Sequence, residues 1–296
     1  MRIIYCDSVL DRRQIEPDYE DEKNAAIAHG FGFSLISYEA LTDNNISTAL
    51  QLVKSAESKE RGIYRGWMLT AEQYRRLYDA LLQKNIQLIN TPIEYAHCHH
   101  LPNSYAQIAH KTPYSVWTTD ITETSVLDLT KSFGNTAIIV KDYVKSEKHH
   151  WEEACFIPDA SDNDKVKSVV NKFIELRGDY LTEGLVFRQF EELEYLTQHS
   201  KSGMPLTKEY RLFFMNKKIV LLSPYWDEGT YQETTVELDE FIEIAQTIAS
   251  NFFTMDIAQK KDGKWIIMEL GDGQVAGLPD NVSRNEFYAK LCSQND

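Results

Sequence analysis

The sequence predicts a mixed fold, in which an N-terminal α/β domain precedes two smaller α+β parts. Strand-like and helix-like segments alternate through the first hundred residues, which is the pattern of an α/β layer. Isolated β-branched runs and two hairpin-like segments follow. With 296 residues, 43 % of them hydrophobic, the chain is long enough for two or three domains with separate cores. We place these domains at residues 1–110, 111–185 and 186–296.

The predicted helices of the first domain have start and stop signals. Pro17 suits the first turn of a helix, and Gly30 suits the position after its end. Thr70 and Gln73 form a capping box for a helix over residues 71–85. A further helix is expected over 47–57 and strands over 2–6, 33–37, 62–65 and 86–90. A proline-containing loop over 91–113 then ends the domain.

The remaining two domains contain fewer sequence patterns that predict strands and helices, but these patterns are longer. In the middle part we expect a strand over 136–141, a helix over 164–177 stopped by Gly178, and a strand over 185–190. In the last part we expect a hairpin of residues 209–215 and 218–223, then a helix over 239–250. A second hairpin follows, and Ser283 with Glu286 caps a final short helix.

The second hairpin carries an acidic pair. Asp262-Gly263 between two apolar runs is the strongest short signal for a two-residue hairpin turn. That turn would place Ile257 opposite Met268 and Asp256 opposite Glu269. Directly opposed like charges destabilise a sheet unless a cation lies between them. Since carboxylates that leave room for water and phosphate suit Mg²⁺, the register predicts a magnesium–nucleotide site.

A simpler interpretation is that the acidic pair lies in solvent beside lysines. Lys260, Lys261 and Lys264 are close to the turn. However, the acidic pair is about 20 Å further along the strands, inside apolar stretches where an unpaired charge is costly. The metal interpretation is therefore favoured.

Charge and cysteine usage exclude several classes of protein. The formal net charge of −14 does not suit a generic nucleic-acid coat, although a local basic groove is compatible with it. The four scattered cysteines form no disulfide-like framework, which favours a reducing compartment and a cytoplasmic protein. The N-terminal apolar run is too short for a signal peptide, and no run approaches the roughly 18 residues of a membrane span.

Three cationic residues on predicted strands call for anionic partners. Arg211 shares a strand face with Glu209 and Phe213, so its partner is either Glu209 or a bound phosphate. Lys141 ends an apolar strand, and Lys145 lies on the same face if the extended run continues. Both lysines could bind phosphate, or Lys145 could belong to a solvated turn.

Taken together, these features resemble the ATP-grasp superfamily, and within it the clade named for one arginine and two lysines, which includes RNA-ligase-like proteins. The resemblance extends over nearly the whole chain. It rests on Tyr64–Leu69, Tyr95–Pro102, Val140–Ser146, Val186–Phe190, Glu209–Phe213 and Met268–Gln274. It implies an N-terminal α/β domain that helps to bind the acceptor, followed by a two-subdomain ATP-grasp fold that holds ATP between its subdomains.

The resemblance also implies roles for individual residues. Lys141 and Lys145 would hold the α- and β-phosphates of ATP, and Arg211 the γ-phosphate. The linker strand would bind adenine through Gln189 and Phe190, and Glu191 or Glu192 would take the ribose. Arg188 would be the arginine of the clade or would point into the cleft. Many members have Glu-x-Asn as metal ligands, whereas this chain has Glu269-Leu270-Gly271, so Asp272 is the candidate third ligand beside Asp256 and Glu269.

Candidates for the acceptor site lie in the N-terminal part. Arg65 and Trp67 follow a predicted strand, and loops at the carboxyl ends of parallel strands line the ligand crevice of an α/β layer. Trp67 could equally be a core residue. His99 and His100 could line a substrate pocket or be structural, since their spacing does not suit zinc. The complete set of acceptor candidates is Arg12, Arg13, Arg65, Trp67, His99 and His100.

Three functions fit these expectations. The first is an ATP- and Mg²⁺-dependent ligase that activates a carboxylate as an acyl phosphate for attack by an amine. The second is an RNA-end ligase or RNA-repair enzyme that acts through an adenylate, and the third is a non-catalytic ATP-binding module. The expected partners are ATP and an acceptor, which is a small molecule, a peptide or an RNA end.

Overall fold

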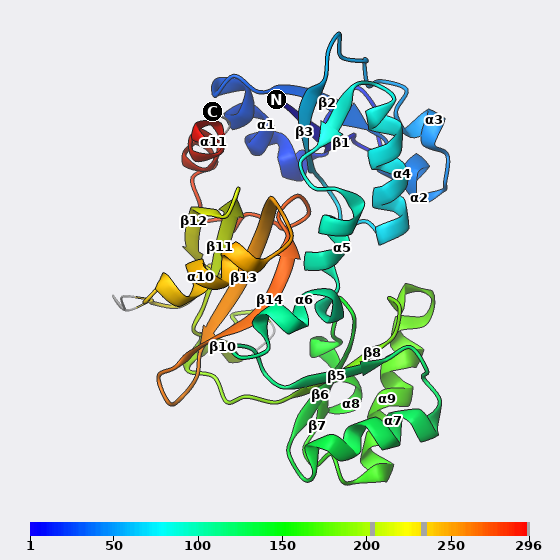
Figure 1. Cartoon of the computed structure of the whole chain (residues 1–296), viewed down its shortest axis with the longest axis vertical. Coiled ribbons are helices and arrows are strands. Elements are labelled where there is room, and N and C mark those ends of the chain that lie inside the picture. The colour runs from blue at the N-terminus through cyan, green and yellow to red at the C-terminus, as the bar shows by residue number, and fades with distance from the viewer. Residues whose placement is uncertain (202–204, 232–235, 295–296) are drawn as a thin grey trace.

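A computed structural model of the chain describes residues 1–201, 205–231 and 236–294. In Figure 1 the N-terminal domain lies at the top, the central subdomain at the bottom, and the C-terminal sheet between them. The expected fold class is confirmed, because one sheet is entirely parallel and the others are antiparallel. The described residues also contain four short 3₁₀ helices, at Pro17–Tyr19, Lys131–Phe133, Lys148–His150 and Gly178–Tyr180.

The N-terminal sheet has the strand order β2-β1-β3-β4. Alternate residues of its strands face two different cores: Ile3 and Tyr5 face α1, whereas Ile4 and Cys6 face α2, α3 and α4. The elements are β1 (Arg2–Cys6), α1 (Glu20–Ala28), β2 (Gly32–Ile36), α2 (Tyr38–Thr42), α3 (Ile46–Ala49), β3 (Glu60–Arg65), α4 (Ala71–Leu82) and β4 (Ile86–Leu88).

Two expectations for this region are wrong. The helix expected over 47–57 is only the four-residue α3, and the serine-containing segment after it does not continue the helix. The expected loop over 91–113 contains α5 (Pro92–His99) and α6 (Leu101–Ile108). Pro92 and Pro102 lie in the first turns of these helices, where no intrahelical amide bond is lost, and Thr91 with Glu94 forms a capping box.

The central sheet has the order β5-β8-β6-β7. Ile138, Val140 and Phe187 point toward α7 and α9 and form one core. Lys141 and Arg188 directly follow Val140 and Phe187 along their strands, so they share the other face of the sheet. The expected boundary between residues 185 and 186 falls inside β8. The elements are β5 (Ser115–Thr118), α7 (Glu123–Thr130), β6 (Ile138–Asp142), α8 (Trp151–Ala154), β7 (Phe156–Ile157), α9 (Asn163–Arg177) and β8 (Leu185–Gln189).

The C-terminal sheet has the order β12-β11-β13-β14, and its two faces differ. One face packs against α10 and α6. Half of the other face, including Phe213 and Phe252, shares a core with the N-terminal domain and with α11, which lies beside α1 (Figure 1). The elements are β9 (Tyr195–Gln198), β10 (Pro205–Thr207), β11 (Glu209–Met215), β12 (Lys218–Pro224), α10 (Asp239–Thr247), β13 (Phe252–Gln259), β14 (Trp265–Asp272) and α11 (Arg284–Ser293).

The turn between β13 and β14 differs from the expected two-residue loop. Lys260 donates its amide to Lys264, so three residues form the loop, and Gly263 adopts a φ of 85°. Near the turn the register is therefore shifted by one residue, and Ile257 pairs with Ile267 instead of Met268. A β-bulge at Met268 then restores the expected opposition of Asp256 and Glu269.

Candidate active site

A row of four polar residues crosses the C-terminal sheet on the face that points to the central subdomain. Ser223, Arg211, Asp256 and Glu269 are successive cross-strand partners on β12, β11, β13 and β14. Side chains directly opposite one another on neighbouring strands share a face. The sheet therefore brings together the three residues for which the sequence predicts metal and γ-phosphate binding.

Arg211 and Asp256 form a two-pronged ion pair. Arg211 donates from Nε to Oδ1 of Asp256 at 2.8 Å and from Nη2 to Oδ2 at 2.7 Å. The expected partners were Glu209 or a phosphate, but Glu209 instead bonds to Thr207 and Trp226. The aromatic ring of Tyr225 lies 4.7 Å from the guanidinium. These contacts hold the guanidinium in one orientation, and Asp256 retains lone pairs for a second ligand.

Lys141 faces this row from the central sheet. It is buried on β6, and its Nζ lies 3.6 Å from Oε1 of Glu269. Lys145 does not extend the strand as expected. The carboxylate of Asp142 accepts hydrogen bonds from the amides of Val144 and Lys145, which turns the chain after β6.

Glu269 is the accessible member of the acidic pair. Its side chain is 47 % exposed, whereas that of Asp256 is 7 % exposed. Burial opposes the ionisation of Glu269, but the positive charges of Lys141, Lys145, Arg211 and Arg188 outweigh it and lower the pKa. Four cationic groups thus lie around two carboxylates, and this excess of positive charge suits a polyphosphate.

The donor set fits a hard divalent cation with an incomplete protein shell. Across the described residues, no group of three or more metal-binding side chains of the histidine, cysteine, aspartate or glutamate type is present. Two facing carboxylates are nevertheless what Mg²⁺ commonly uses when phosphates and water complete its shell. Asp256 and Glu269 would hold that ion.

Asp272 does not fit the expected role of third ligand. It pairs with Phe253, and strand alternation places it on the face opposite Glu269. It is completely buried and accepts hydrogen bonds from Asn90 and from the backbone and side chain of Gln274. Burial raises its pKa to about 7. Its contacts indicate a role in joining the C-terminal sheet to the N-terminal domain.

Arg188 connects the central sheet to β14. Its Nη1 donates to the carbonyl of Met268 at 2.5 Å, and its Nη2 donates to the carbonyl of Ile267 and the hydroxyl of Thr112. Burial lowers its pKa to about 10. Its buried Nε has no acceptor within the described part of the chain. Arg188 thus lies at the junction of the two subdomains, next to the acidic pair.

The linker after β8 runs toward the tip of the acidic hairpin. Gln189 donates to Glu191, and the two acids form ion pairs with lysines of that tip, Glu191 with Lys260 and Glu192 with Lys261. Both carboxylates assigned to the ribose are thus paired, although an exposed pair such as that of Glu192 contributes little.

An aromatic cluster beside this linker was missed at the level of sequence. Phe190 packs edge-on against the rings of Trp151 and Phe156, which are stacked on each other. All three residues are half-buried. Phe156 belongs to the two-residue strand β7, which is too short to give a periodic signal in the sequence.

The predicted acceptor residues are not brought together. Arg65 is completely buried, and its guanidinium binds Glu22 and the carbonyls of Gly273 and Ala276, so the expectation that it contacts the acceptor is wrong. Arg12 pairs with Asp7. Arg13 is exposed, and Trp67, 40 % exposed, packs edge-on against Tyr19 near the carboxyl end of β3.

The two histidines are buried close to the lysines of the site. His99 stacks on Tyr95, and His100 lies edge-on to Tyr143. Burial, with the charges of His100, Lys145 and Lys141 adding to it, lowers the pKa of His99 to about 3. His99 is therefore neutral at physiological pH, and its burial leaves little surface for an acceptor.

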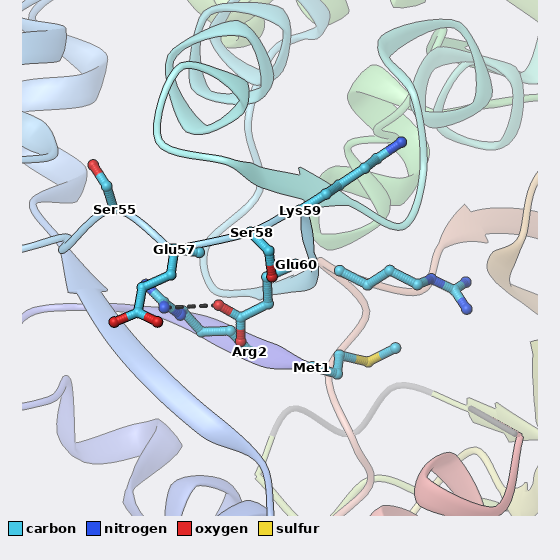
Figure 2. Close-up of a pocket in the computed structure, with 9 residues that line it drawn as sticks. Met1, Arg2, Ser55, Glu57, Ser58, Lys59 and Glu60 are labelled. Atoms are coloured by element: carbon cyan, nitrogen blue, oxygen red, sulfur yellow. Dashed lines mark ion pairs between the residues drawn. The ribbon is translucent and has the colours of Figure 1, made fainter.

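An open pocket of about 400 Å³ adjoins Arg211. Tyr225, Trp226, Leu278 and Pro279 contribute its apolar wall, and Glu228 lies on its polar side. Another pocket, of about 550 Å³, lies at the amino ends of β1 and β3, where Arg2 and Glu60 point toward each other (Figure 2). Only the first of these two pockets touches the polar row.

Comparison with known families identifies the class of protein. Residues 132–291 match the family described as ATP-grasp domain, R2K clade family 3. Since this match extends over more than half of the chain, the protein belongs to that family. The resemblance recognised in the sequence is thereby confirmed. A comparison with curated proteins gave no significant match.

Solved structures of the same fold align along nearly the entire chain. A RimK domain ATP-grasp protein from Sphaerobacter thermophilus DSM 20745 is 11 % identical, with a TM-score of 0.61 and coverage of 99 % of this chain and 98 % of that one. The ATP-grasp ligase PsnB, complexed with precursor peptide PsnA2 and AMPPNP, is 11 % identical, with a TM-score of 0.59 and coverage of 100 % of this chain and 97 % of that one. D-alanyl-alanine synthetase A from Vibrio cholerae O1 biovar eltor str. N16961 is 12 % identical, with a TM-score of 0.57 and coverage of 99 % of this chain and 97 % of that one. At these identities the likeness establishes the fold.

None of the helices in the described residues is both long and apolar enough to cross a membrane.

Proposed function

We propose that this protein is an ATP- and Mg²⁺-dependent ligase that activates a carboxylate as an acyl phosphate and transfers the acyl group to an amine. The observation that carries the proposal is the Arg211–Asp256–Glu269 row facing Lys141 across the two sheets. This arrangement offers two carboxylates for a cation and several fixed cations for phosphate. Catalysis of this kind depends on positioning and electrostatics, and it needs no covalent protein nucleophile.

Each group would have a separate task. Mg²⁺ on Asp256 and Glu269 would neutralise charge on the β- and γ-phosphates. Lys141 and Lys145 would bind phosphate oxygens, and Arg211 would bind the γ-phosphoryl group with its planar fork. As that group moves to the substrate carboxylate, ADP leaves. Attack by the amine then forms an amide bond and releases phosphate.

The adenine would lie by the linker after β8. The backbone of Gln189 and Phe190 supplies hydrogen-bonding groups there, and Trp151, Phe156 and Phe190 supply an apolar surface suited to a flat base. Glu191 or Glu192 would bind the ribose after exchanging a lysine partner.

The acceptor would bind in the pocket beside Arg211. This pocket is open and lined in part by Arg211, so its contents would lie next to the γ-phosphate that Arg211 is proposed to bind. Its volume and its apolar wall are compatible with a peptide side chain or terminus. PsnB, which shares the fold, was crystallised with a precursor peptide, so peptides belong among the first acceptors to test.

Less supports an RNA acceptor. Of the six N-terminal arginines that could form its groove, four are engaged by acids: Arg12 by Asp7, Arg65 by Glu22, and Arg75 with Arg76 by Glu72. The remaining two are Arg13 and Arg61.

The proposal is tested by identifying whether ATP is converted to ADP or to AMP. The protein is incubated with Mg²⁺ and ATP, once with a pool of amino acids, small carboxylates and peptides, and once with RNA fragments. ADP and phosphate formed only with the first pool would support it. AMP formed only with RNA would replace it by the adenylate mechanism, and binding of ATP without either product would favour a non-catalytic module.

Glu269→Gln and Asp256→Asn should each abolish Mg²⁺-dependent turnover while the fold persists, because each removes one carboxylate charge from the row. Asp262→Asn at the tip of the same hairpin is the matched control, since its carboxylate is exposed and pairs with Lys264. Circular dichroism verifies the fold. Turnover with unchanged Mg²⁺ dependence in both variants would remove the metal site from the proposal.

A further inference from the structure

The bulge in β14 decides which side of the sheet Glu269 occupies. Between the turn and Ile267 the strands pair without interruption, with Ala258 opposite Ile266 and Ile257 opposite Ile267. If this register continued, Asp256 would lie opposite Met268. A shift of one residue moves every later side chain to the other face, so Glu269 would point toward the core and Met268 would take its place opposite Asp256. The extra residue Met268 prevents this.

The bulge lies on the outer edge of the sheet, where no further strand from the described part of the chain pairs with it. β14 is the last strand in the order β12-β11-β13-β14. Its edge is covered by the linker between α6 and β5: Ile267 donates its amide to the carbonyl of Lys111 at 2.8 Å, and Thr112 donates its hydroxyl to the carbonyl of Ile267 at 2.7 Å. A bulge disrupts the ladder and leaves backbone groups to be satisfied by other partners.

Arg188 supplies the partner for the bulged residue itself. Its guanidinium binds the carbonyls of Met268 and Ile267, and the hydroxyl of Thr112 accepts a further bond from Nη2. The side chain is 4 % exposed, and it reaches β14 from a strand of the other subdomain. One buried side chain thus contacts the carbonyls of the two residues that precede Glu269. These contacts depend on the docking of the central sheet on the C-terminal sheet.

We propose that Arg188 is a positioning residue that holds the bulge at Met268 and thereby keeps Glu269 opposite Asp256. The metal pair is then complete only when the central sheet is docked on the C-terminal sheet. The effect on metal binding rests on the proposed function, whereas the effect on the bulge does not.

The competing role is direct contact with the nucleotide. Since Nε of Arg188 lacks an acceptor among the described residues, it could donate to a phosphate. The two roles make opposite predictions for the protein without ligands, because only the positioning role changes β14 there.

The test compares Arg188→Met with the wild-type protein by hydrogen–deuterium exchange, without metal or nucleotide. We expect amides in residues 264–271 to exchange at least about tenfold faster, which corresponds to losing one charged hydrogen bond or more. Peptides from α9 and α10 should not change. Arg284→Met is the matched control, because Arg284 also binds backbone carbonyls, at Pro279 and Val282, but away from β14.

A second measurement separates the two roles. In Arg188→Met the dissociation constant for Mg²⁺ in the presence of ATP should rise about tenfold, and by a larger factor than the dissociation constant for metal-free ATP, which loses only one of the surrounding positive charges. Unchanged exchange in β14, or a loss of metal-free ATP affinity alone, would overturn the proposal. Faster exchange in a protein whose wild type binds neither Mg²⁺ nor ATP would leave the bulge assignment standing and refute the proposed function instead.

If Arg188→Met does not fold, Thr112→Val offers a milder change. It removes the hydroxyl between Arg188 and Ile267 and keeps the shape of the side chain. Exchange in residues 264–271 should rise in the same direction by a smaller factor, and no rise would count against the proposal.

Discussion

Lys141 is a buried lysine that faces a half-exposed carboxylate from another sheet. A buried ammonium is costly unless it is paired, and Glu269 at 3.6 Å is a loose partner. A phosphate oxygen would complete its hydrogen bonds. Lys141→Met should therefore weaken ATP binding about 10- to 150-fold, the equivalent of a charge-assisted contact of about 1.5–3 kcal/mol.

Isothermal titration with a non-hydrolysable ATP analogue measures this effect. Lys131→Met is the control, because Lys131 is exposed and pairs with Asp128 on the far helix α7 and its extension. Wild-type affinity in Lys141→Met would exclude Lys141 from the phosphate site.

Asp272 predicts a dependence of stability on pH. Burial raises its pKa from 3.8 to about 7, so the folded state favours the neutral acid. The stabilisation is complete below pH 4 and is lost as the pH rises toward 7, by up to about 4 kcal/mol. Asp272→Asn keeps a neutral group, so its free energy of unfolding should fall less than that of the wild type over this range. Urea unfolding at pH 4, 5.5 and 7.5 compares them, and parallel curves would contradict the assignment.

At the scale of residues, a charge within an apolar strand was a good indicator of a site residue, whereas the burial of that residue could not be predicted. Lys141, Arg211, Asp256 and Glu269 stood out as charges in apolar runs, and the structure brings all four together. The same reasoning could not separate Arg65 from them. Its partner Glu22 lies 43 positions away on a helix, and such pairing is invisible without the fold.

At the scale of elements, the pairing of β13 with β14 leaves no room for a side chain at Gly271, close to the acidic pair. Gly271 lies opposite Thr254, and a Cβ at position 271 would come within 2.7 Å of Oγ1 of Thr254. Gly271→Ala should therefore destabilise the protein by about 1–3 kcal/mol.

The double variant Thr254→Ala with Gly271→Ala should regain most of that loss, because removing the hydroxyl and methyl makes room for the new side chain. Thermal unfolding of the two single variants and the double variant gives the coupling energy. Additive effects would show that the two positions do not share the space.

The acidic hairpin shows how an element can be predicted correctly for an incomplete reason. A two-residue turn and an unbroken ladder give the same opposition of Asp256 and Glu269 as the three-residue turn and the bulge that the structure contains. The two differences cancel in register. Their origin could not be inferred from the hairpin alone, because the partner of the bulge is Arg188 on a distant strand.

At the scale of the whole molecule, a buried network joins the first domain to the last. Arg65 binds Glu22 at 2.8 and 2.9 Å, Tyr288 of α11 donates to Glu22, and Arg65 reaches the carbonyls of Gly273 and Ala276. Arg65→Met should lower the free energy of unfolding by about 3–5 kcal/mol, because Glu22 would be left as an unpaired buried charge.

Denaturant unfolding followed by tryptophan fluorescence and by circular dichroism measures this loss. Arg75→Met on α4 is the control, since Arg75 is half exposed and pairs only with neighbours on its own helix. A loss below 1 kcal/mol would show that the network contributes little.

The alternation of strands and helices in the N-terminal part was predictable, whereas the packing of the parts on one another was not. Apolar runs predicted β6 and β8 of the central sheet and β11 to β14 of the C-terminal sheet, but the short strands β5 and β7 were not predicted. The return of α11 to pack on β1 and α1 depends on a core shared by residues almost 300 positions apart, and no local pattern encodes it.

β14 is held at two places by arginines that come from the other two parts of the chain, Arg188 at the bulge and Arg65 beyond the strand's end. Such a strand cannot be transferred to another protein without the two arginines that bind it. A chimera that replaced residues 1–110 with an unrelated α/β domain would leave the buried carbonyl of Gly273 and the carbonyl of the half-buried Ala276 without the donor that Arg65 provides. Recombination of this scaffold would succeed only where the incoming domain carries its own arginine to that position.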